Sequence, residues 1–278
     1  MSTPRVAAIH DLSGFGRCSL TIVLPTLAAM GVQCCPLPTA YLSTHTGGFT
    51  GNTFLDLTDQ MAPVTAHWQS LHLTFDAVYS GFMGSRRQIE LTAAFLQAFR
   101  DGRCLAVVDP VMGDHGKAYR TYTTEMCRAM AKLAQQADVI TPNRTEAALL
   151  LDVPYGELRL EDAADCRRWA RALSLNGQRS VVLTGAEPAV GVVGAACYDR
   201  ETGMSELVTA RRIEGQYHGT GDLFASVLTG ALVRGRRLAE AARQAAGFVS
   251  LCAQRTLQAG IPPREGVEFE PLLWQLGK

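Results

Sequence analysis

Short apolar segments alternate with longer amphipathic segments along the first two thirds of the chain. The apolar segments are continuous rather than alternating, which is typical of strands buried on both faces of a parallel sheet. They lie at 5–10, 32–38, 77–80, 104–109, 139–141 and 180–184. Helices are predicted between them, at 19–30, 86–100, 124–136 and 162–175. This alternation predicts successive βαβ units, with Gly31 ending the first helix.

The pattern changes after Thr184. Apolar segments at 190–198 and 206–210 predict an antiparallel hairpin, and two helices are predicted at 222–234 and 238–256. No repeat, low-complexity segment or Ser/Gly/Pro-rich linker divides the chain. We therefore expect α/β structure in one domain over 1–278, a three-layer α/β/α arrangement with a mostly parallel sheet and an antiparallel edge.

Composition excludes several classes of protein. Hydrophobic residues make up 47% of the 278 residues and charged residues 19%, the balance of a folded domain rather than a disordered chain. Lys+Arg and Asp+Glu number 26 each, so no net charge attracts the chain to nucleic acid or to an anionic membrane. No apolar run reaches membrane-spanning length and the N-terminus lacks an export signal, so we expect a cytoplasmic protein. The eight cysteines contain no C-x-x-C pair, which favours buried thiols over disulfides or zinc.

Common nucleotide-binding motifs do not account for the polar segments. A G-x-G-x-x-S sequence opens the first predicted helix, as a dinucleotide fingerprint would. No Asp or Glu occurs between Asp11 and Asp56 to bind a ribose, however. The chain contains no Walker A sequence either.

The segment from His218 to Asp222, H-G-T-G-D, directly precedes a predicted apolar helix. Its two glycines allow the backbone to approach a ligand closely, and the amides at a helix start bind anions. Asp222 has two interpretations. It could cap the helix, or it could be a general base that takes the proton from a hydroxyl attacking a phosphoryl group.

Two further acidic segments follow predicted strands, whose carboxyl ends meet at one edge of a parallel sheet. Asn143 and Glu146 share a helix face and suit Mg²⁺, although the same pair is typical of a capping box. Asp109 and Asp114 flank a glycine turn. They could hold cations near a triphosphate or be ordinary turn residues.

The G-T-G-D, N-x-x-E and D-P-V-M-G-D sequences, in this order and spacing, resemble the ribokinase-like (PfkB) superfamily. Within it the vitamin B6 kinases, which act on pyridoxal, pyridoxine and pyridoxamine, are most similar. The segments at 9–16 and 42–48 strengthen this resemblance, and the second is similar to the B6-kinase segment that contacts the pyridine ring. The resemblance covers essentially the whole chain.

The resemblance implies ATP-dependent phosphorylation of the 5′-hydroxymethyl group of a B6 vitamer. Asp222 would be the general base, and Gly219, Thr220 and Gly221 would form the anion hole for the transferring phosphate. The implied ATP-binding residues are Asp109, Thr141, Asn143, Thr184, Gly219 and Gly221. The implied ligands of Mg²⁺ are Glu146, Asn143 and Asp109. Members of the family are commonly homodimers, and many respond to K⁺.

The resemblance also implies a vitamer pocket. Its residues would be Asp11, Ser13, His45, Thr46, Phe82 and Asp222. The local alignment leaves open whether Asp11 or Ser13 contacts the substrate. Phe82 falls where many relatives carry Tyr, so a ring stack is retained but a hydroxyl contact is not. The opening segment and the loop most resemble pyridoxamine kinases.

Three other functions compete with this hypothesis. A hydroxymethylpyrimidine kinase of thiamine synthesis performs the same chemistry, but many such enzymes carry Cys at the position of Asp222. A non-catalytic sensor of a vitamer or nucleotide would keep the fold, although this chain retains every acid and glycine of the implied site. A sugar kinase of the superfamily would need an early β insertion, for which 32–73 leaves little room.

Overall fold

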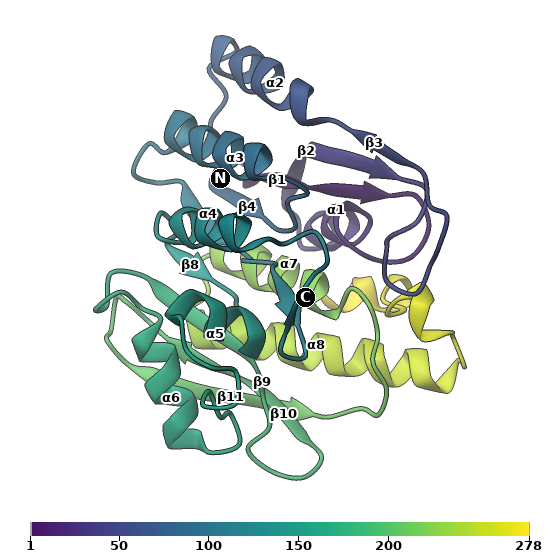
Figure 1. Cartoon of the computed structure of the whole chain (residues 1–278), viewed down its shortest axis with the longest axis vertical. Coiled ribbons are helices and arrows are strands. Elements are labelled where there is room, and N and C mark those ends of the chain that lie inside the picture. The colour runs from purple at the N-terminus through teal and green to yellow at the C-terminus, as the bar shows by residue number, and fades with distance from the viewer. Residues whose placement is uncertain (1, 278) are drawn as a thin grey trace.

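Nine strands form one sheet in the computed structural model, which describes residues 2–277 (Figure 1). The strands are β1 (Arg5–Ser13), β2 (Gln33–Leu42), β3 (Phe54–Asp56), β4 (Ala77–Ser80), β5 (Leu105–Val108), β8 (Val139–Ile140), β9 (Ser180–Ala186), β10 (Val192–Tyr198) and β11 (Ser205–Arg211). Their order is β11-β10-β9-β8-β5-β4-β1-β2-β3. Two very short strands, β6 (Gly113–Asp114) and β7 (Lys117–Ala118), form a separate hairpin.

Six neighbouring strands of this sheet are parallel, as predicted, namely β2, β1, β4, β5, β8 and β9. The predicted hairpin β10–β11 continues the sheet antiparallel to β9. The opposite edge is also antiparallel, because β3 pairs with the end of β2. β3 was not predicted, and β2 extends beyond its predicted end at Pro38 to Leu42.

Helices cover both faces of the sheet (Figure 1). One layer consists of α1 (Leu20–Ala29), α7 (Thr220–Val233) and α8 (Leu238–Gln258). The other consists of α2 (Thr58–Ser70), α3 (Arg86–Phe99), α4 (Thr124–Ala134), α5 (Arg144–Leu151) and α6 (Ala163–Ala172). Two 3₁₀ turns, Pro263–Glu265 and Glu270–Gln275, follow α8. The predicted three-layer α/β/α fold is confirmed.

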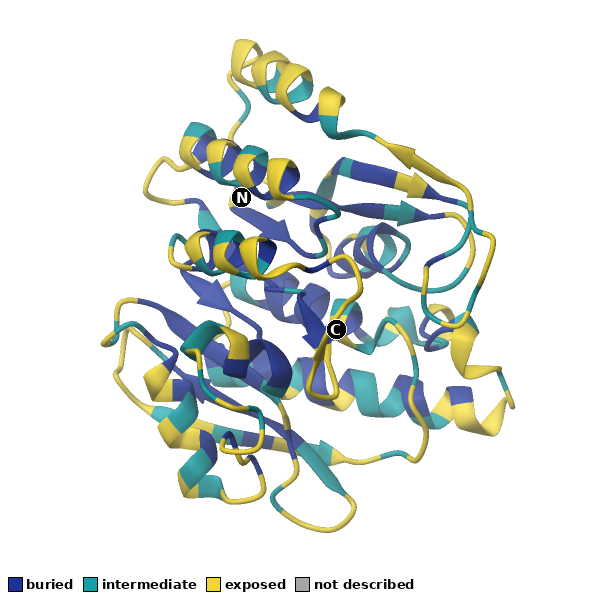
Figure 2. Ribbon diagram, viewed as in Figure 1, coloured by how far each residue is buried: buried dark blue, intermediate teal, exposed yellow. Residues whose placement is uncertain are grey.

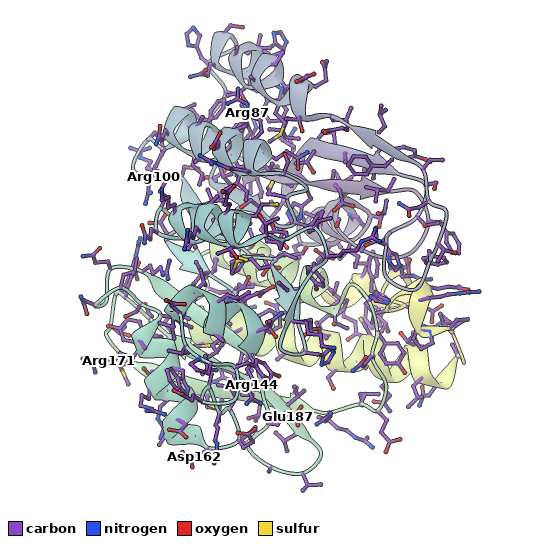
Figure 3. The ribbon with its side chains drawn as sticks, in the orientation of Figure 1. Arg87, Arg100, Arg144, Asp162, Arg171 and Glu187 are labelled. Carbon is purple, nitrogen blue, oxygen red and sulfur yellow. The ribbon has the colours of Figure 1, made fainter. Side chains whose placement is uncertain are left out.

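The strands are buried on both faces because each helical layer covers alternate side chains (Figure 2). In β1, Val6 and Ala8 pack toward α1, α7 and α8, whereas Ala7 and Ile9 pack toward the other layer. This arrangement explains why the strand segments contain so few polar residues. Charged side chains such as Arg87 and Arg171 project from the outer surfaces of the helices (Figure 3). Among residues 2–277, no helix is long and apolar enough to cross a membrane.

Two helices differ from what the sequence predicts. α7 begins at Thr220 and not at Asp222, with Gly219 as its N-cap. Asp222 therefore lies in the first turn of the helix, and the interpretation of Asp222 as an N-cap residue is wrong. α2 was not predicted because Met61 is its single buried residue, which leaves no apolar stripe to recognise.

Candidate active site

The first turn of α7 lies at the edge of the sheet where the parallel strands end. Gly219 adopts φ 79°, a left-handed conformation that glycine accepts readily. A Cβ atom at Gly219 would lie 2.3 Å from the carbonyl oxygen of Arg17 and 2.5 Å from Cδ1 of Ile22. Only glycine therefore fits between α7 and the start of α1. A Cβ at Gly221 would meet no atom within 4 Å, because Gly221 faces open space.

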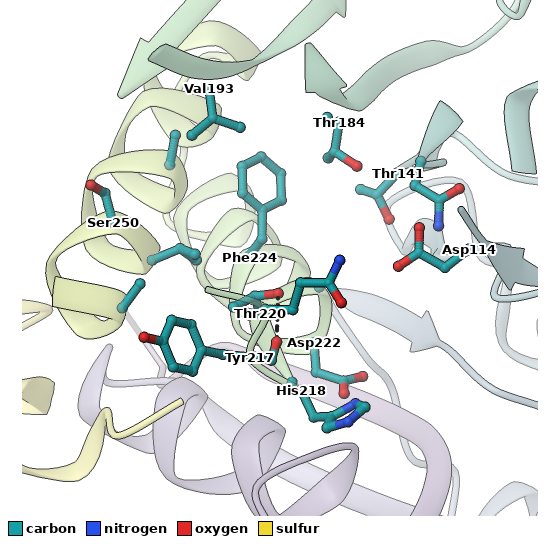
Figure 4. A pocket seen from close by; sticks show the side chains of 18 of the residues that line it. Asp114, Thr141, Thr184, Val193, Tyr217, His218, Thr220, Asp222, Phe224 and Ser250 are labelled. Carbon is teal, nitrogen blue, oxygen red and sulfur yellow. Dashed lines mark hydrogen bonds between the residues drawn. The ribbon is translucent and has the colours of Figure 1, made fainter. Parts of the chain in front are cut away.

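Asp222 is half-buried and points from this turn toward the cavity described below (Figure 4). Its Oδ2 accepts a hydrogen bond from the backbone N–H of Ser19 at 2.9 Å. Burial raises the pKa of Asp222 to about 6, the Ser19 amide opposes this shift, and the charge of Asp11 adds to it. A carboxylate with a pKa close to neutrality suits a general base.

Asp109, which directly follows β5, and Glu146, in the first turn of α5, form a second acidic group. Asp109 is 7% exposed and Glu146 is 3% exposed. Burial, and then the charge of Asp222, raise the pKa of Asp109 to about 7. Burial, and then the charge of Asp109, raise the pKa of Glu146 well above its usual range. The three carboxyl groups therefore share one electrostatic environment.

Asn143 and Glu146 form the capping box at the start of α5. The side chain of Asn143 accepts the N–H of Glu146 at 3.0 Å, and Glu146 accepts the N–H of Asn143 at 2.8 Å. The other oxygen of Glu146 accepts the N–H of Met112 at 3.2 Å. Asn143 also donates to the carbonyl of Gly113 at 2.9 Å. Within residues 2–277, no three His, Cys, Asp or Glu side chains converge closely enough to hold a metal ion.

A cavity of about 510 Å³ connects these groups (Figure 4). Its lining includes nine of the predicted site residues. They are Asp109, Thr141, Asn143, Glu146, Thr184, Gly219, Thr220, Gly221 and Asp222. The other end is less polar and is formed by Val193, Gly194, Phe224 and residues of α8. The cavity therefore has an acidic end with exposed helix amides and an apolar end that could accept a planar ring.

The remaining predicted residues are not part of the lining of this cavity. His45 is buried, and its ring lies 4.9 Å from the ring of His218, which directly precedes Gly219. His45 accepts the N–H of Gly47 at 3.0 Å through Nδ1, so Nε2 donates to the carbonyl of Arg264 at 2.7 Å. Thr46 is exposed.

The G-x-G sequence before α1 allows the loop that carries His45 to pack closely. A Cβ at Gly16 would lie 2.3 Å from the ring of His45, so the glycine allows the loop to pack closely against the end of β1. Asp11 and Ser13 are both buried, and Ser13 Oγ donates to Asp11 at 3.1 Å. Phe82 is half-buried and lies 6.0 Å from the ring of Tyr122.

Comparison with known proteins identifies the family. The family model for phosphomethylpyrimidine kinase matches residues 23–265. The chain belongs to this family. A Bacteroides thetaiotaomicron protein assigned as a phosphomethylpyrimidine kinase and crystallised with pyridoxal is 40% identical, with a TM-score of 0.89 over 99% of this chain and 96% of that one.

Two further relatives are a pyridoxal kinase and a hydroxymethylpyrimidine/phosphomethylpyrimidine kinase. The pyridoxal kinase of Lactobacillus plantarum is 35% identical, with a TM-score of 0.90 over 99% of this chain and 97% of that chain. The hydroxymethylpyrimidine/phosphomethylpyrimidine kinase of Streptomyces coelicolor is 28% identical over 284 aligned positions, which cover 100% of this chain and 97% of that protein. The chain is therefore an ATP-dependent small-molecule kinase with a ribokinase-like fold.

Several residues that line the kinase cavity were not predicted. Ala246, Ser250 and Ala253 form one face of α8 at helical spacing, and their small side chains leave the apolar end open. This stripe of small residues was visible in the sequence. His115 and Gln216 also line the cavity and approach each other within 3.2 Å, but they are 101 positions apart. No local pattern indicates such a pair.

Proposed function

We propose that this kinase transfers the γ-phosphoryl group of ATP to the 5′-hydroxymethyl group of a vitamin B6 vitamer, with Asp222 as the general base. The observation that carries this proposal is the half-buried Asp222 carboxylate in the first turn of α7, beside glycines that expose the helix amides to the cavity. The relative crystallised with pyridoxal supports a B6 vitamer as the acceptor.

The roles of the chain's own groups follow from their positions. Asp222 accepts the proton of the acceptor hydroxyl as that oxygen attacks the γ-phosphorus and the bond to the β-phosphate oxygen breaks. The amides of Gly219, Thr220 and Gly221 stabilise the charge on the transferring group. Thr141 and Thr184 line the same cavity, and we expect them to contact the phosphates of ATP. Most of the rate enhancement then comes from positioning and electrostatics.

The acidic pair of Asp109 and Glu146 fits a divalent cation. Burial raises the pKa of both carboxyl groups, and the charge of Asp109 raises the pKa of Glu146 further, so a nearby positive charge would stabilise their ionised forms. Mg²⁺ bound with the phosphates would neutralise charge there. Both oxygens of Glu146 already accept backbone N–H groups, so we expect Glu146 to hold the ion through a water molecule, together with Asn143.

We expect the acceptor to bind near the ends of β1 and β4, where the predicted vitamer residues lie. We expect Phe82 to stack on the pyridine ring, and His45 and Thr46 to contact its polar substituents. The half-buried ring of Phe82 is supported by Tyr122, and the hydrogen bonds of His45 hold its loop in place. Phe82 carries no hydroxyl, so the pocket relies on His45 and Thr46 for polar contacts.

A substrate panel tests the proposal. Purified enzyme with ATP and Mg²⁺, with and without K⁺, is incubated with pyridoxal, pyridoxine, pyridoxamine and hydroxymethylpyrimidine, and products are identified by mass. We expect a phosphorylated vitamer, with pyridoxamine used best, and loss of product in Asp222→Asn. Exclusive turnover of hydroxymethylpyrimidine would overturn the B6 assignment.

Hydroxymethylpyrimidine phosphorylation is the second candidate. The family match over residues 23–265 and the Streptomyces coelicolor relative favour it. The two substrates share a hydroxymethyl group on a six-membered nitrogen heterocycle, so the same base and anion hole serve both. The kcat/KM ratio for the two acceptors in the panel discriminates between these functions.

We also propose that the kinase is a homodimer that buries the β3 edge of the sheet. Phe54 is 54% exposed, Leu55 58% and Tyr41 43%, which makes this edge apolar and accessible. Light scattering during gel filtration should give twice the monomer mass, and Leu55→Glu should give the monomer. The control Leu257→Glu alters a comparably exposed leucine on α8 and should remain dimeric.

A further inference from the structure

Ser19, which directly precedes α1, has an unusual backbone conformation. Its φ is 48° and its ψ is −132°. Positive φ is uncommon outside glycine, and this ψ lies outside the left-handed helical region that other residues occupy when φ is positive. Such a conformation is strained and persists only where surrounding contacts hold it.

The hydroxyl of Ser19 does not perform the usual task of a serine at this position. A serine before a helix typically caps the backbone N–H groups of the first turn, but the Ser19 side chain makes no cap hydrogen bond. Its Oγ instead donates to Oδ1 of Asp11 at 2.6 Å. Asp11 is 6% exposed, and its Oδ2 accepts the hydroxyl of Ser13 at 3.1 Å. Both oxygens of Asp11 are thus occupied within the protein.

The backbone of Ser19 makes the second contact. Its N–H donates to Oδ2 of Asp222 at 2.9 Å, which joins the start of α1 to the first turn of α7. The two segments are closely packed, because a Cβ at Gly219 would collide with the carbonyl oxygen of Arg17. The strained conformation of Ser19 thus coincides with a hydrogen bond to the proposed base.

We propose that Ser19 is a positioning residue for Asp222, and that Asp11 anchors Ser19 instead of binding the substrate. This inference rests on the proposed function of Asp222 as the general base. The hydrogen bond to Asp11 holds the backbone of Ser19 in its strained conformation, and that conformation directs the N–H to one oxygen of Asp222. The other oxygen, Oδ1, is then oriented toward the acceptor hydroxyl.

Two substitutions of Ser19 separate its hydroxyl from its backbone. Ser19→Ala removes the anchor and leaves a residue that disfavours φ 48°, so the N–H should turn away from Asp222. Ser19→Gly also removes the anchor but accepts the conformation without strain. We expect kcat to fall about 10–100-fold in Ser19→Ala and to recover in Ser19→Gly to within about fivefold of wild type. Because Ser19 does not line the nucleotide cavity, KM for ATP should change less than about twofold in both.

Ser174→Ala is the matched control. Ser174 is a fully buried serine that also makes two hydrogen bonds, with the carbonyl of Arg171 and the N–H of Gly177. It precedes β9 and lies near the amino ends of the parallel strands, whereas the site lies at their carboxyl ends. Its substitution should lower thermal stability and leave kcat per folded enzyme unchanged. Wild-type kcat in Ser19→Ala, or equal losses in Ser19→Ala and Ser19→Gly, would overturn the proposal.

Crystal structures of the wild type and Ser19→Ala provide a readout independent of turnover. A displaced Asp222 carboxylate, with residue 19 at negative φ, supports the proposal, and an unmoved carboxylate overturns it. If the wild type phosphorylates none of the tested alcohols, the proposed function fails, and these structures alone decide the role of Ser19.

Discussion

At the scale of single residues, the protonation state of Asp222 decides whether this carboxyl group can act as the proposed general base. Burial raises the pKa of this carboxyl group to about 6, while the Ser19 amide stabilises its charged form. A base with a pKa near the working pH combines a large ionised fraction with appreciable basicity. Asp222 satisfies this requirement because it is half-buried in the first turn of a helix and not free in solvent.

This pKa leads to a prediction for the pH profile. A base is active when ionised, so activity is present above the pKa and is lost as the pH falls through it. We expect kcat/KM for the acceptor alcohol to decline about tenfold per pH unit below about 6. Asp222→Asn should lower kcat by at least about 10²-fold and abolish this decline, while calorimetry detects ATP binding close to that of wild type. An acidic limb that persists in the residual activity of the variant would assign the titration to another group.

Residues with a chemical signature could be predicted from the sequence, whereas supporting residues could not. Asp222, Asp109 and Glu146 each follow a strand or precede a helix in a recognisable motif, and the structure places all three at one cavity. Ser19 resembled the last position of a failed dinucleotide motif. Its hydrogen bond to Asp222 spans 203 positions, and this contact exists only after α1 and α7 have packed together.

At the scale of elements, the first turn of α7 combines two glycines with opposite requirements. Gly219 is fixed by its left-handed φ of 79° and by its contact with Arg17. Gly221 lies within the helix, and a Cβ atom at this position would meet no atom within 4 Å. The first glycine is therefore needed for folding, and the second is needed for ligand access.

Alanine at each glycine tests this division. Gly221→Ala should leave the melting temperature unchanged or slightly raised, because alanine favours a helix by about 1 kcal/mol over glycine. Its methyl group would occupy the anion hole, so kcat/KM for ATP should fall at least about tenfold. Gly219→Ala should instead lower the melting temperature by several degrees. Calorimetry and steady-state kinetics on both variants check this, and an unstable Gly221→Ala would contradict it.

Elements with a clear hydrophobic pattern could be predicted, and those without one could not. The buried strands and α3 were found because their apolar residues follow the required period. α2 buries Met61 alone, and all of β3 is exposed, so neither shows a pattern that distinguishes it from a loop. β3 forms because β2 continues past the end of its apolar segment and offers a free edge.

At the scale of the whole molecule, the buried carboxyl groups of the site lower the free energy of unfolding. Asp109, Asp222 and Glu146 all have raised pKa values because burial disfavours their charged forms. The folded state therefore binds more protons than the unfolded state between about pH 4 and pH 7. By linkage, the stability of the unliganded protein decreases as the pH rises through this range. Function explains why the carboxyl groups are retained, since stability is commonly lost where an active site needs charge.

Asp109→Asn measures this cost. The pKa of Asp109 rises from about 4 in the unfolded chain to about 7 in the folded protein, so its ionisation costs on the order of 4 kcal/mol above pH 7 and little below pH 4. We expect the variant to be more stable than wild type at pH 8, with a melting temperature several degrees higher, and this gain to shrink to a small fraction at pH 4.5, while its kinase activity falls. Asp59→Asn, at an exposed position of α2, is the control for the loss of one negative charge. Calorimetric scans from pH 4.5 to pH 8 give the comparison, and a gain from Asp109→Asn that is the same at every pH would show that its charge is not the cause.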